Sequence, residues 1–405
     1  MSELSYMEKL LDGVEVEWKL LEEVGKFQRG KRFVKKDMIS EGFPCIHYGE
    51  MYTHYDIWAN TSKSFVDKDL ASKLRVAECG DVVIVAAGET IEDIGRGTAW
   101  LGESSVVIHD ACFSYKSPLN PKYVSYFLRT KMFQDQIKPY ISSGKISAIN
   151  AKGLGKAKIP IPPLNVQAEI VRILDTFTEL TAELIAELTA RQQQYAYYRE
   201  QLLTFGEGEV IWEKLEDVAN FSNGKGHEKD ISTDGRYVVV NSKFISTNGN
   251  AVKYSDKQIC PLFINDILIV MSDLPNGKAL AKTFFVEEDD KYTLNQRIGS
   301  ITVKNNVNLL PKFLCYFLNR TPQLLKYDDG ASQTNLRKGQ IVGVRIPIPP
   351  LSEQKRIVSI LDKFDALTTS LTEGLPREIE LRQQQYEYYR DLLLSFPKPE
   401  VVAND

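Results

Sequence analysis

The sequence predicts an α+β fold in which two related mixed α/β regions are each followed by a long helix. The first observation is a repeated motif, because IPIPPLNVQAEIVRILDTF at 159–177 recurs as IPIPPLSEQKRIVSILDKF at 346–364 with 13 of 19 positions identical. The second is that RQQQYAYYREQLLTF at 191–205 recurs as RQQQYEYYRDLLLSF at 382–396 with 11 of 15 identical. Each copy joins a proline-rich start to an amphipathic segment, so one architecture occurs twice in the chain.

The composition is that of an ordinary globular chain. With 405 residues, 43% of them hydrophobic and 26% charged, the chain is expected to form two to three domains with real cores. No apolar run approaches the ~18 residues that span a bilayer, and the N-terminus lacks the basic-then-apolar order of a signal peptide. Five scattered cysteines without a CxxC pair favour a reduced, cytoplasmic protein, with each thiol a small core residue rather than a disulfide or zinc ligand.

The charge distribution matters more than the net charge of −4. Seven Lys/Arg and three acids lie in 19–37, and five lysines without an acid lie in 138–158. Local basic segments of this kind are compatible with nucleic-acid binding despite a negative total.

The first α/β region shows strand and helix signals in turn. We expect strands in GFPCIHYGEMY, GDVVIVAAG and SSVVIHDACFSY, each bounded by turn residues. Asn120 is expected to cap, and Pro121 to open, one helix through 121–137. A short helix is expected near 6–11, and LLDGVEVEW resembles 202–212, so the N-terminal segment is predicted to pack near the C-terminal helix.

The second α/β region repeats the first at lower identity. Seven positions recur at one constant offset, pairing Trp18, Leu21, Glu22, Val24, Phe27, Gly30 and Lys31 with Trp212, Leu215, Glu216, Val218, Phe221, Gly224 and Lys225. The loop IEDIGRGTAWLGES, in contrast, has no counterpart in LPNGKALAKTFF. This pattern predicts one scaffold that carries two different recognition surfaces.

Both long helices show apolar residues three or four positions apart, as in coiled coils. Asn165 is a plausible cap for a helix that reaches Phe205, which would span roughly 60 Å. The second copy is four residues longer, and Gly374-Leu-Pro376 is predicted to break it. The predicted coiled-coil positions are Leu174, Phe177, Leu184, Leu188, Tyr195, Leu361, Phe364, Leu371, Tyr386 and Tyr389.

Catalytic motifs are missing from the sequence. There is no phosphate loop, no GxGxxG after a strand, and both Pro-Pro pairs are followed by leucine rather than an aromatic residue. The four histidines have no metal spacing and are interpreted as turn or surface residues, and Asp81, Glu89 and Glu92 as solvated loop charges. We therefore expect a chain that catalyses nothing and binds neither cofactor nor metal.

These motifs together resemble one family. Two variable α/β regions, each followed by IPIPPL…Q…IVxILDxF and a helix ending in RQQQYxYYRxxLLxF, resemble the specificity subunit of type I restriction–modification enzymes, in particular its enterobacterial type IC branch. The resemblance implies two target-recognition domains that each read one half of a split, asymmetric sequence in double-stranded DNA. It implies that the helices pack as an antiparallel coiled coil that sets the spacer.

The resemblance also implies partners and cofactors. Two methylation subunits would bring S-adenosylmethionine, and two restriction/translocase subunits would bring ATP and Mg. No catalytic residue carries over, because the family's specificity subunit has none. The implied domains are a lead-in at 1–17, recognition domains at 18–158 and 212–345, a central repeat at 159–211 and a distal repeat at 346–405.

Basic and amide side chains in predicted loops are the candidate DNA contacts, since Lys and Arg serve phosphates or guanine edges and Asn and Gln suit adenine. In the first region they are Arg29, Lys31, Arg32, Lys35, Arg96, Lys145 and Lys152, with Arg96 expected to be exposed. In the second region they are Asn223, Lys225, Lys278, Gln296, Arg297, Gln333 and Lys338.

Two other functions remain open on sequence grounds. A self-contained DNA-modifying enzyme with diverged motifs would methylate adenine without partners. A coiled-coil scaffold that binds proteins only would show no salt-dependent DNA binding.

Overall fold

The computed structural model describes residues 10–397 apart from 12, 207, 228, 275–276 and 371. The chain forms two compact units, which we call unit 1 (residues 1–183 and 380–405) and unit 2 (residues 184–379). Helix α8 (Leu164–Leu203) contributes its first half to unit 1 and its second half to unit 2.

Unit 1 contains two five-stranded sheets. The first has the order β2-β12-β8-β10-β5, with bounds Lys26–Arg29, Cys112–Lys116, Val82–Val85, Gly97–Trp100 and Trp58–Ala59. The second has the order β3-β6-β4-β11-β7, with bounds Met38–Ile39, Ser64–Val66, Phe43–Ile46, Val106–Ile108 and Val76–Ala77. Two short pairs complete the unit, β1 (Glu17–Leu20) with β14 (Lys158–Ile161) and β9 (Ala87–Gly88) with β13 (Ser147–Ala148).

Unit 2 contains two four-stranded sheets. The first has the order β16-β24-β20-β22, with bounds Ala219–Asn223, Ile298–Val303, Ile267–Val270 and Thr283–Phe285. The second has the order β17-β19-β18-β23, with bounds Ile231–Ser232, Tyr254–Ser255, Tyr237–Val240 and Tyr292–Leu294. Its short pairs are β15 (Ile211–Lys214) with β26 (Arg345–Ile348) and β21 (Ser272–Asp273) with β25 (Thr334–Asn335).

Short helices connect the strands of both units. Those of unit 1 are α2 (Leu21–Val24), η1 (Lys35–Asp37), α3 (Glu50–Thr53), α4 (Lys68–Ala71), η2 (Ile91–Asp93), α5 (Pro121–Phe127), α6 (Lys131–Ile137), η3 (Lys138–Tyr140) and α7 (Ala151–Gly155). Those of unit 2 are α9 (Leu215–Val218), α10 (Ser242–Ser246), α11 (Pro311–Leu318), α12 (Pro322–Leu325) and α13 (Lys338–Val342).

The expected repeat is confirmed in the sheets, and one detail of the prediction is wrong. Strands β10 and β22 occupy the same place, each antiparallel to the buried strand β8 or β20. The segments IEDIGRGTAWLGES and LPNGKALAKTFF, expected to have no counterparts, therefore both contain an equivalent strand. Their sequences differ along with their settings, since β10 is a buried inner strand and β22 is a half-buried edge strand.

The helix expected at 121–137 is two helices. Asn120 caps α5 as predicted, since its side chain accepts from the backbone N–H groups of Lys122 and Tyr123. The chain then turns at 128–130, and Thr130 caps α6 by accepting from the backbone N–H of Phe133 at 3.2 Å. A threonine at such a position competes with the helical hydrogen bonds and starts a second helix.

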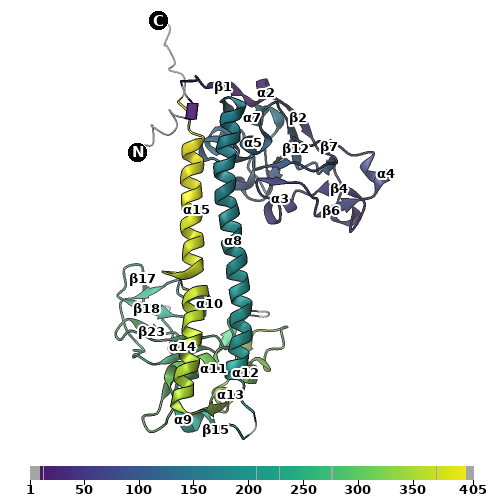
Figure 1. Cartoon of the computed structure of the whole chain (residues 1–405). Coiled ribbons are helices and arrows are strands. Elements are labelled where there is room, and N and C mark those ends of the chain that lie inside the picture. Colours follow the sequence, from purple (N-terminus) through teal and green to yellow (C-terminus); the bar gives the residue numbers. More distant parts are fainter. Residues whose placement is uncertain are drawn as a thin grey trace. The chain divides into compact units, whose positions relative to one another are not determined.

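Long helices pack together within each unit (Figure 1). In unit 1, Phe177 of α8 stacks on Tyr389 of α15 (Gly374–Leu393) at 5.4 Å between ring centroids. In unit 2, Tyr195 of α8 stacks on Phe364 of α14 (Leu351–Thr368) at 5.7 Å. Residue numbers rise along α8 while they fall along its partners, so the packing is antiparallel, as expected.

The break predicted at Gly374-Leu-Pro376 separates α14 from α15. Of the other predicted coiled-coil positions, Leu174, Leu361 and Tyr386 are buried, and Leu184 and Leu188 are half-buried. Leu371 and most of the helix expected at 6–11 lie outside the described residues. In the described part of the chain, no helix is both long and apolar enough to cross a membrane.

Candidate nucleic-acid interface

Unit 1 has a polar hollow where two parallel strands end. Strands β4 and β11 run parallel with Ile46 opposite Ile108, so the next residues, His47 and His109, emerge together. Their rings lie 4.7 Å apart between centroids. Both line a hollow of about 430 Å³ that the basic residues Arg32 and Lys35 also line. In α/β structures the carboxyl ends of parallel strands are where ligands commonly bind.

Both histidines use one ring nitrogen to hold the local backbone. Nδ1 of His109 accepts the backbone N–H of Ala111 at 3.1 Å, and Nδ1 of His47 accepts that of Gly49 at 3.2 Å. The proton of each neutral ring therefore lies on Nε2. Burial lowers the pKa of both rings below the ordinary value, since a charged imidazole loses hydration there.

The interpretation of the histidines as turn or surface residues is right only in part, since three of the four lie in turns but not at the surface. His47, His109 and His227 are buried, and of the four only His54 is exposed. Their positions directly after apolar strands explain this for His47 and His109, because a strand's burial extends to the first turn residue. Among the cysteines, Cys79 is exposed rather than in the core.

The candidate DNA contacts of unit 1 fall into three groups. Arg32 and Lys35 line the hollow, and two neighbours bind backbone at its edge, with Arg29 Nε donating to Asp110 O and Lys31 Nζ to Lys73 O, both at 2.8 Å. Lys145 and Lys152 are exposed and do not line the hollow.

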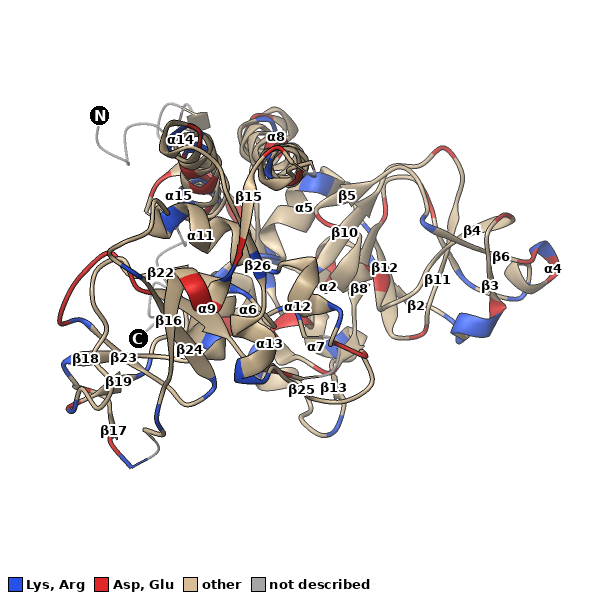
Figure 2. Cartoon of the chain, turned by 90° about the horizontal axis from the view of Figure 1, so that it is seen from below, with Lys and Arg blue, Asp and Glu red and all other residues tan. Residues whose placement is uncertain are grey.

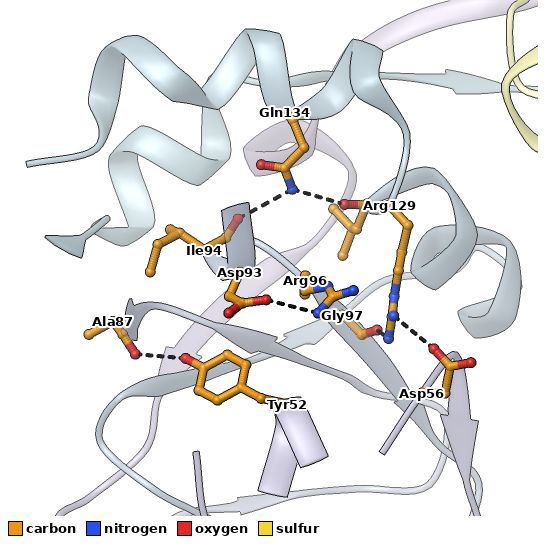
Figure 3. A network of polar contacts seen from close by, with 10 residues as sticks. Tyr52, Asp56, Ala87, Asp93, Ile94, Arg96, Gly97, Arg129 and Gln134 are labelled. Carbon is orange, nitrogen blue, oxygen red and sulfur yellow. Dashed lines mark hydrogen bonds and ion pairs between the residues drawn. The ribbon is translucent and has the colours of Figure 1, made fainter. Parts of the chain in front are cut away.

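Arg96 is the exception in unit 1. It was expected to be exposed, but its side chain is 38% accessible and donates to Asp93 Oδ1 at 2.8 Å. Figure 3 shows this pair in a network with Arg129, which ion-pairs with Asp56 at 2.7 Å. Asp93, three residues earlier, provides a local ion-pair partner for Arg96, and the prediction of an exposed arginine did not take this partner into account.

Unit 2 has a hollow at the same edge. Strands β18 and β23 run parallel with Val240 opposite Leu294, so Asn241 and Asn295 follow them. Both asparagines line a hollow of about 640 Å³ together with Gln296, Arg297 and Gln333. Lys and Arg occur on loops of both units, interspersed with Asp and Glu (Figure 2).

The asparagines are held by their side-chain oxygens. Oδ1 of Asn241 accepts the backbone N–H of Phe244 at 2.9 Å and caps α10, and Oδ1 of Asn295 accepts that of Arg297 at 3.3 Å. Within the described part of the chain, Nδ2 of each asparagine has no hydrogen-bond partner. Each side chain therefore presents an oriented amide donor at the hollow.

The hollow of unit 2 gathers three of its seven predicted contacts. Gln296, Arg297 and Gln333 line it, and Gln333 Nε2 also donates to Ser272 Oγ at 2.8 Å. The backbone of Lys225 pairs with that of Asn295 in an isolated parallel β-bridge. The remaining predicted contacts, which are exposed but do not line the hollow, are Asn223, Lys278 and Lys338.

Sequence reasoning missed several lining residues. Those of unit 2 are Asn241, Lys243, Lys253 and Asn295, and those of unit 1 are His47 and His109. A usable signal existed, since Asn241 and Asn295 directly follow the strand-like runs YVVV and YTL. Among the described residues, no cluster of His, Cys, Asp or Glu has the arrangement of a metal site.

The chain is similar to known proteins over its whole length. The family model for the type I restriction modification DNA specificity domain matches residues 13–191 and 209–381. The type I restriction enzyme EcoR124I/EcoR124II specificity subunit of Escherichia coli is 36% identical over 100% of both chains. A putative type I restriction enzyme specificity subunit of Haemophilus influenzae, S.HindORF215P, is 32% identical over 97% of this chain and 98% of its own.

A solved structure has a similar fold. The type I restriction–modification S subunit from M. genitalium superposes with a TM-score of 0.56 at 15% identity, and the match covers 96% of this chain and 98% of that one. At this identity the match speaks for the fold alone.

Proposed function

The chain belongs to the family of type I restriction–modification specificity subunits, and from this premise we propose how its parts divide the recognition of DNA. It is a non-catalytic DNA-recognition subunit in which each of two recognition domains reads one half of a bipartite, asymmetric target. The observation that carries this function is one scaffold present twice, with a differently lined hollow at the same edge in each unit. Reading two unlike half-sites requires this combination of shared framework and different side chains.

We propose residues 18–158 and 212–345 as the two recognition domains. The segments 159–211 and 346–405 would then be the central and distal repeats, with 1–17 as a lead-in beside the distal one. The indole N–H of Trp18, the residue directly after the lead-in, donates to the carbonyl of Pro397 at 3.0 Å, which supports this placement of the lead-in.

We further propose that DNA contacts come from the hollows and their edges. In unit 1 these are Arg29, Lys31, Arg32, Lys35, Lys145 and Lys152, with Arg96 available only after its bond to Asp93 opens. In unit 2 they are Asn223, Lys225, Lys278, Gln296, Arg297, Gln333 and Lys338. Lysines would neutralise phosphates, and amides and arginines would meet base edges.

The repeated helices would dock partner subunits. Tyr197 and Tyr388 are 60% and 50% exposed, respectively, and belong to the two copies of the RQQQY block, so the chain offers the same aromatic feature twice. Two methylation subunits that carry S-adenosylmethionine would bind there, and two restriction/translocase subunits that use ATP and Mg would complete a cytoplasmic complex.

The test is to co-express the chain with a methylation subunit of the same branch and to map N6-methyladenine across the host genome. We expect a split motif with one modified adenine in each half, on opposite strands. An intact co-purifying complex that leaves no motif would contradict the function. Adenine methylation by the purified chain alone would favour a self-contained enzyme instead.

A further inference from the structure

The two units place different side chains at the same two positions of one framework. The residues after the paired parallel strands are His47 and His109 in unit 1 and Asn241 and Asn295 in unit 2. All four line the hollow of their own unit. The inference below rests on the proposed function, since it names the residues that carry it.

The turns that hold the second residue of each pair have the same hydrogen bonds. His109 N–H donates to Ile46 O at 3.2 Å, and Asn295 N–H donates to Val240 O at 3.1 Å. The carbonyls of the same two residues accept from the strand that follows, at 2.9 Å for His109 and 3.0 Å for Asn295. These equivalent bonds fix the position of the side chain independently of its identity.

A glycine closes each turn from the opposite side. A Cβ atom at Gly30 would lie 2.2 Å from the His109 carbonyl oxygen, and one at Gly224 would lie 2.2 Å from that of Asn295. No other residue permits this approach without a backbone shift. The glycine and the lysine after it are among the positions that repeat in the sequence, so the framework is kept while the presented residue changes.

The two side chains share one hydrogen bond and differ in what remains. Each uses an acceptor atom, Nδ1 of His109 or Oδ1 of Asn295, to hold a backbone N–H two residues later. Nδ2 of Asn295 remains as an amide donor without a partner among the described residues, whereas the ring of His109 also bonds the backbone of Phe33. The base-pair edges of the major groove offer matching acceptors in guanine, adenine and thymine.

We propose that His47 in unit 1 and Asn241 with Asn295 in unit 2 are base-reading residues of the two half-sites, with His109 holding the wall of the first hollow. Their N–H groups donate hydrogen bonds to acceptor atoms of one or two base pairs in each half-site. The neighbouring Lys243 and Lys253 of unit 2 hold the phosphates that bring those bases to the hollow. The difference between imidazole and amide then distinguishes the two half-sites.

The test uses Asn295→Asp in the complex with methylation subunits. Aspartate keeps the oxygen that accepts from the Arg297 N–H but replaces the amide donor with an acceptor. Binding is measured on duplexes in which each base pair of the target is exchanged in turn. For the unmodified chain, each exchange is expected to weaken binding by about 5- to 100-fold.

At one or two base pairs of the second half-site, the Asn295→Asp complex should no longer prefer the original base pair. It should bind all exchanged duplexes equally there, or prefer a base that presents a donor, such as cytosine. The loss of binding caused by each base-pair exchange in the first half-site should stay unchanged. The matched control is Asn306→Asp, which adds the same charge at an exposed loop position. In this control, the loss of binding at every exchanged base pair should equal that of the unmodified chain. If Asn295→Asp abolishes binding, Asn295→Ser supplies the same readout without the charge.

An unchanged discrimination profile would overturn the proposal. So would an equal loss on all duplexes, which would make Asn295 a phosphate contact. These outcomes differ from a failure of the proposed function, in which the unmodified complex would already fail to prefer any bipartite duplex.

Discussion

The side chain of Gln354 joins the start of α14 to the loop before α11 through Leu310. Oε1 of Gln354 accepts the backbone N–H of Leu310 at 2.8 Å, while Nε2 donates to the carbonyls of Pro349 at 2.8 Å and Asn308 at 2.9 Å. Gln167 makes the corresponding bond in unit 1, accepting from Asn120 N–H at 2.9 Å. Both glutamines are buried, which explains why the repeated motif keeps this polar residue among apolar ones.

Replacing Gln354 with leucine should destabilise unit 2. The substitution leaves one backbone N–H and two carbonyls without their partner in a buried place, so we expect a loss of at least about 2 kcal/mol. Hydrogen exchange followed by mass spectrometry should show faster exchange at 308–318. Gln193→Leu, at an exposed position of α8, is the control and should leave exchange there unchanged. Equal exchange in both variants would contradict the assigned role.

Unit 1 should lose stability on mild acidification because of its buried histidines. Burial lowers the pKa of His47 and His109 from the ordinary 6.5, so below about that pH the unfolded chain binds more protons than the folded one. Their contribution is thus complete above pH 6.5 and is lost as the pH falls toward the lowered pKa values. Denaturant unfolding measured between about pH 7 and pH 5 should show this decline.

His109→Asn should weaken that decline, because the new side chain can hold the Ala111 N–H but cannot take up a proton. It also removes the repulsion that helps to lower the pKa of His47. The other charges that act on the pair oppose one another, since Glu50 and Asp110 favour protonation whereas Lys35 and Arg32 disfavour it. His54→Asn changes an exposed histidine and should retain the full pH dependence, and the same slope in both variants would refute the explanation.

Gly374 should not tolerate a side chain at the break between α14 and α15. Its φ of +76° is costly for other residues, and a Cβ atom would lie 2.3 Å from the carbonyl oxygen of Ala366. Gly374→Ala is therefore expected to cost about 1–3 kcal/mol. Gly339→Ala offers an opposite control, because that helical glycine has open space around it and alanine is the better helix former. The midpoint temperature of thermal unfolding should fall in Gly374→Ala and should stay the same or rise in Gly339→Ala.

The sequence predicted the parts of the fold that repeat, and it missed those that depend on one side chain in space. Periodicity located α8, the break at Gly374 and the capped start of α5, since local spacing and cap chemistry determine these features. Asp175, which lies in the repeated ILD motif, accepts from Tyr126 at 2.7 Å and from Lys122 at 2.8 Å. Asp362 bonds the equivalent Tyr316 at 2.6 Å. No spacing rule could have joined residues that lie 46 to 53 positions apart.

The candidate interface was less predictable for a related reason. Basic composition found Arg32, Lys35, Arg297 and the glutamines Gln296 and Gln333, because charge and amide groups are visible in a sequence. It could not find the paired residues after the parallel strands, since strand order brings them together. It also overestimated the exposure of Arg96.

Deleting Thr181–Leu184 should shorten the spacer between the half-sites by one or two base pairs. The segment lies inside α8, where its residues are exposed or half-buried, and TAELIAEL at 181–188 is itself a four-residue repeat. Removing four residues takes about 6 Å from a helix, against ~3.4 Å per base pair. Methylation mapping of the variant should show both half-sites unchanged and a shorter gap. Replacing Thr181, Glu183 and Leu184 with alanine, next to the existing Ala182, keeps the length and should keep the gap. An unchanged gap in the deletion variant would show that α8 does not set the spacing.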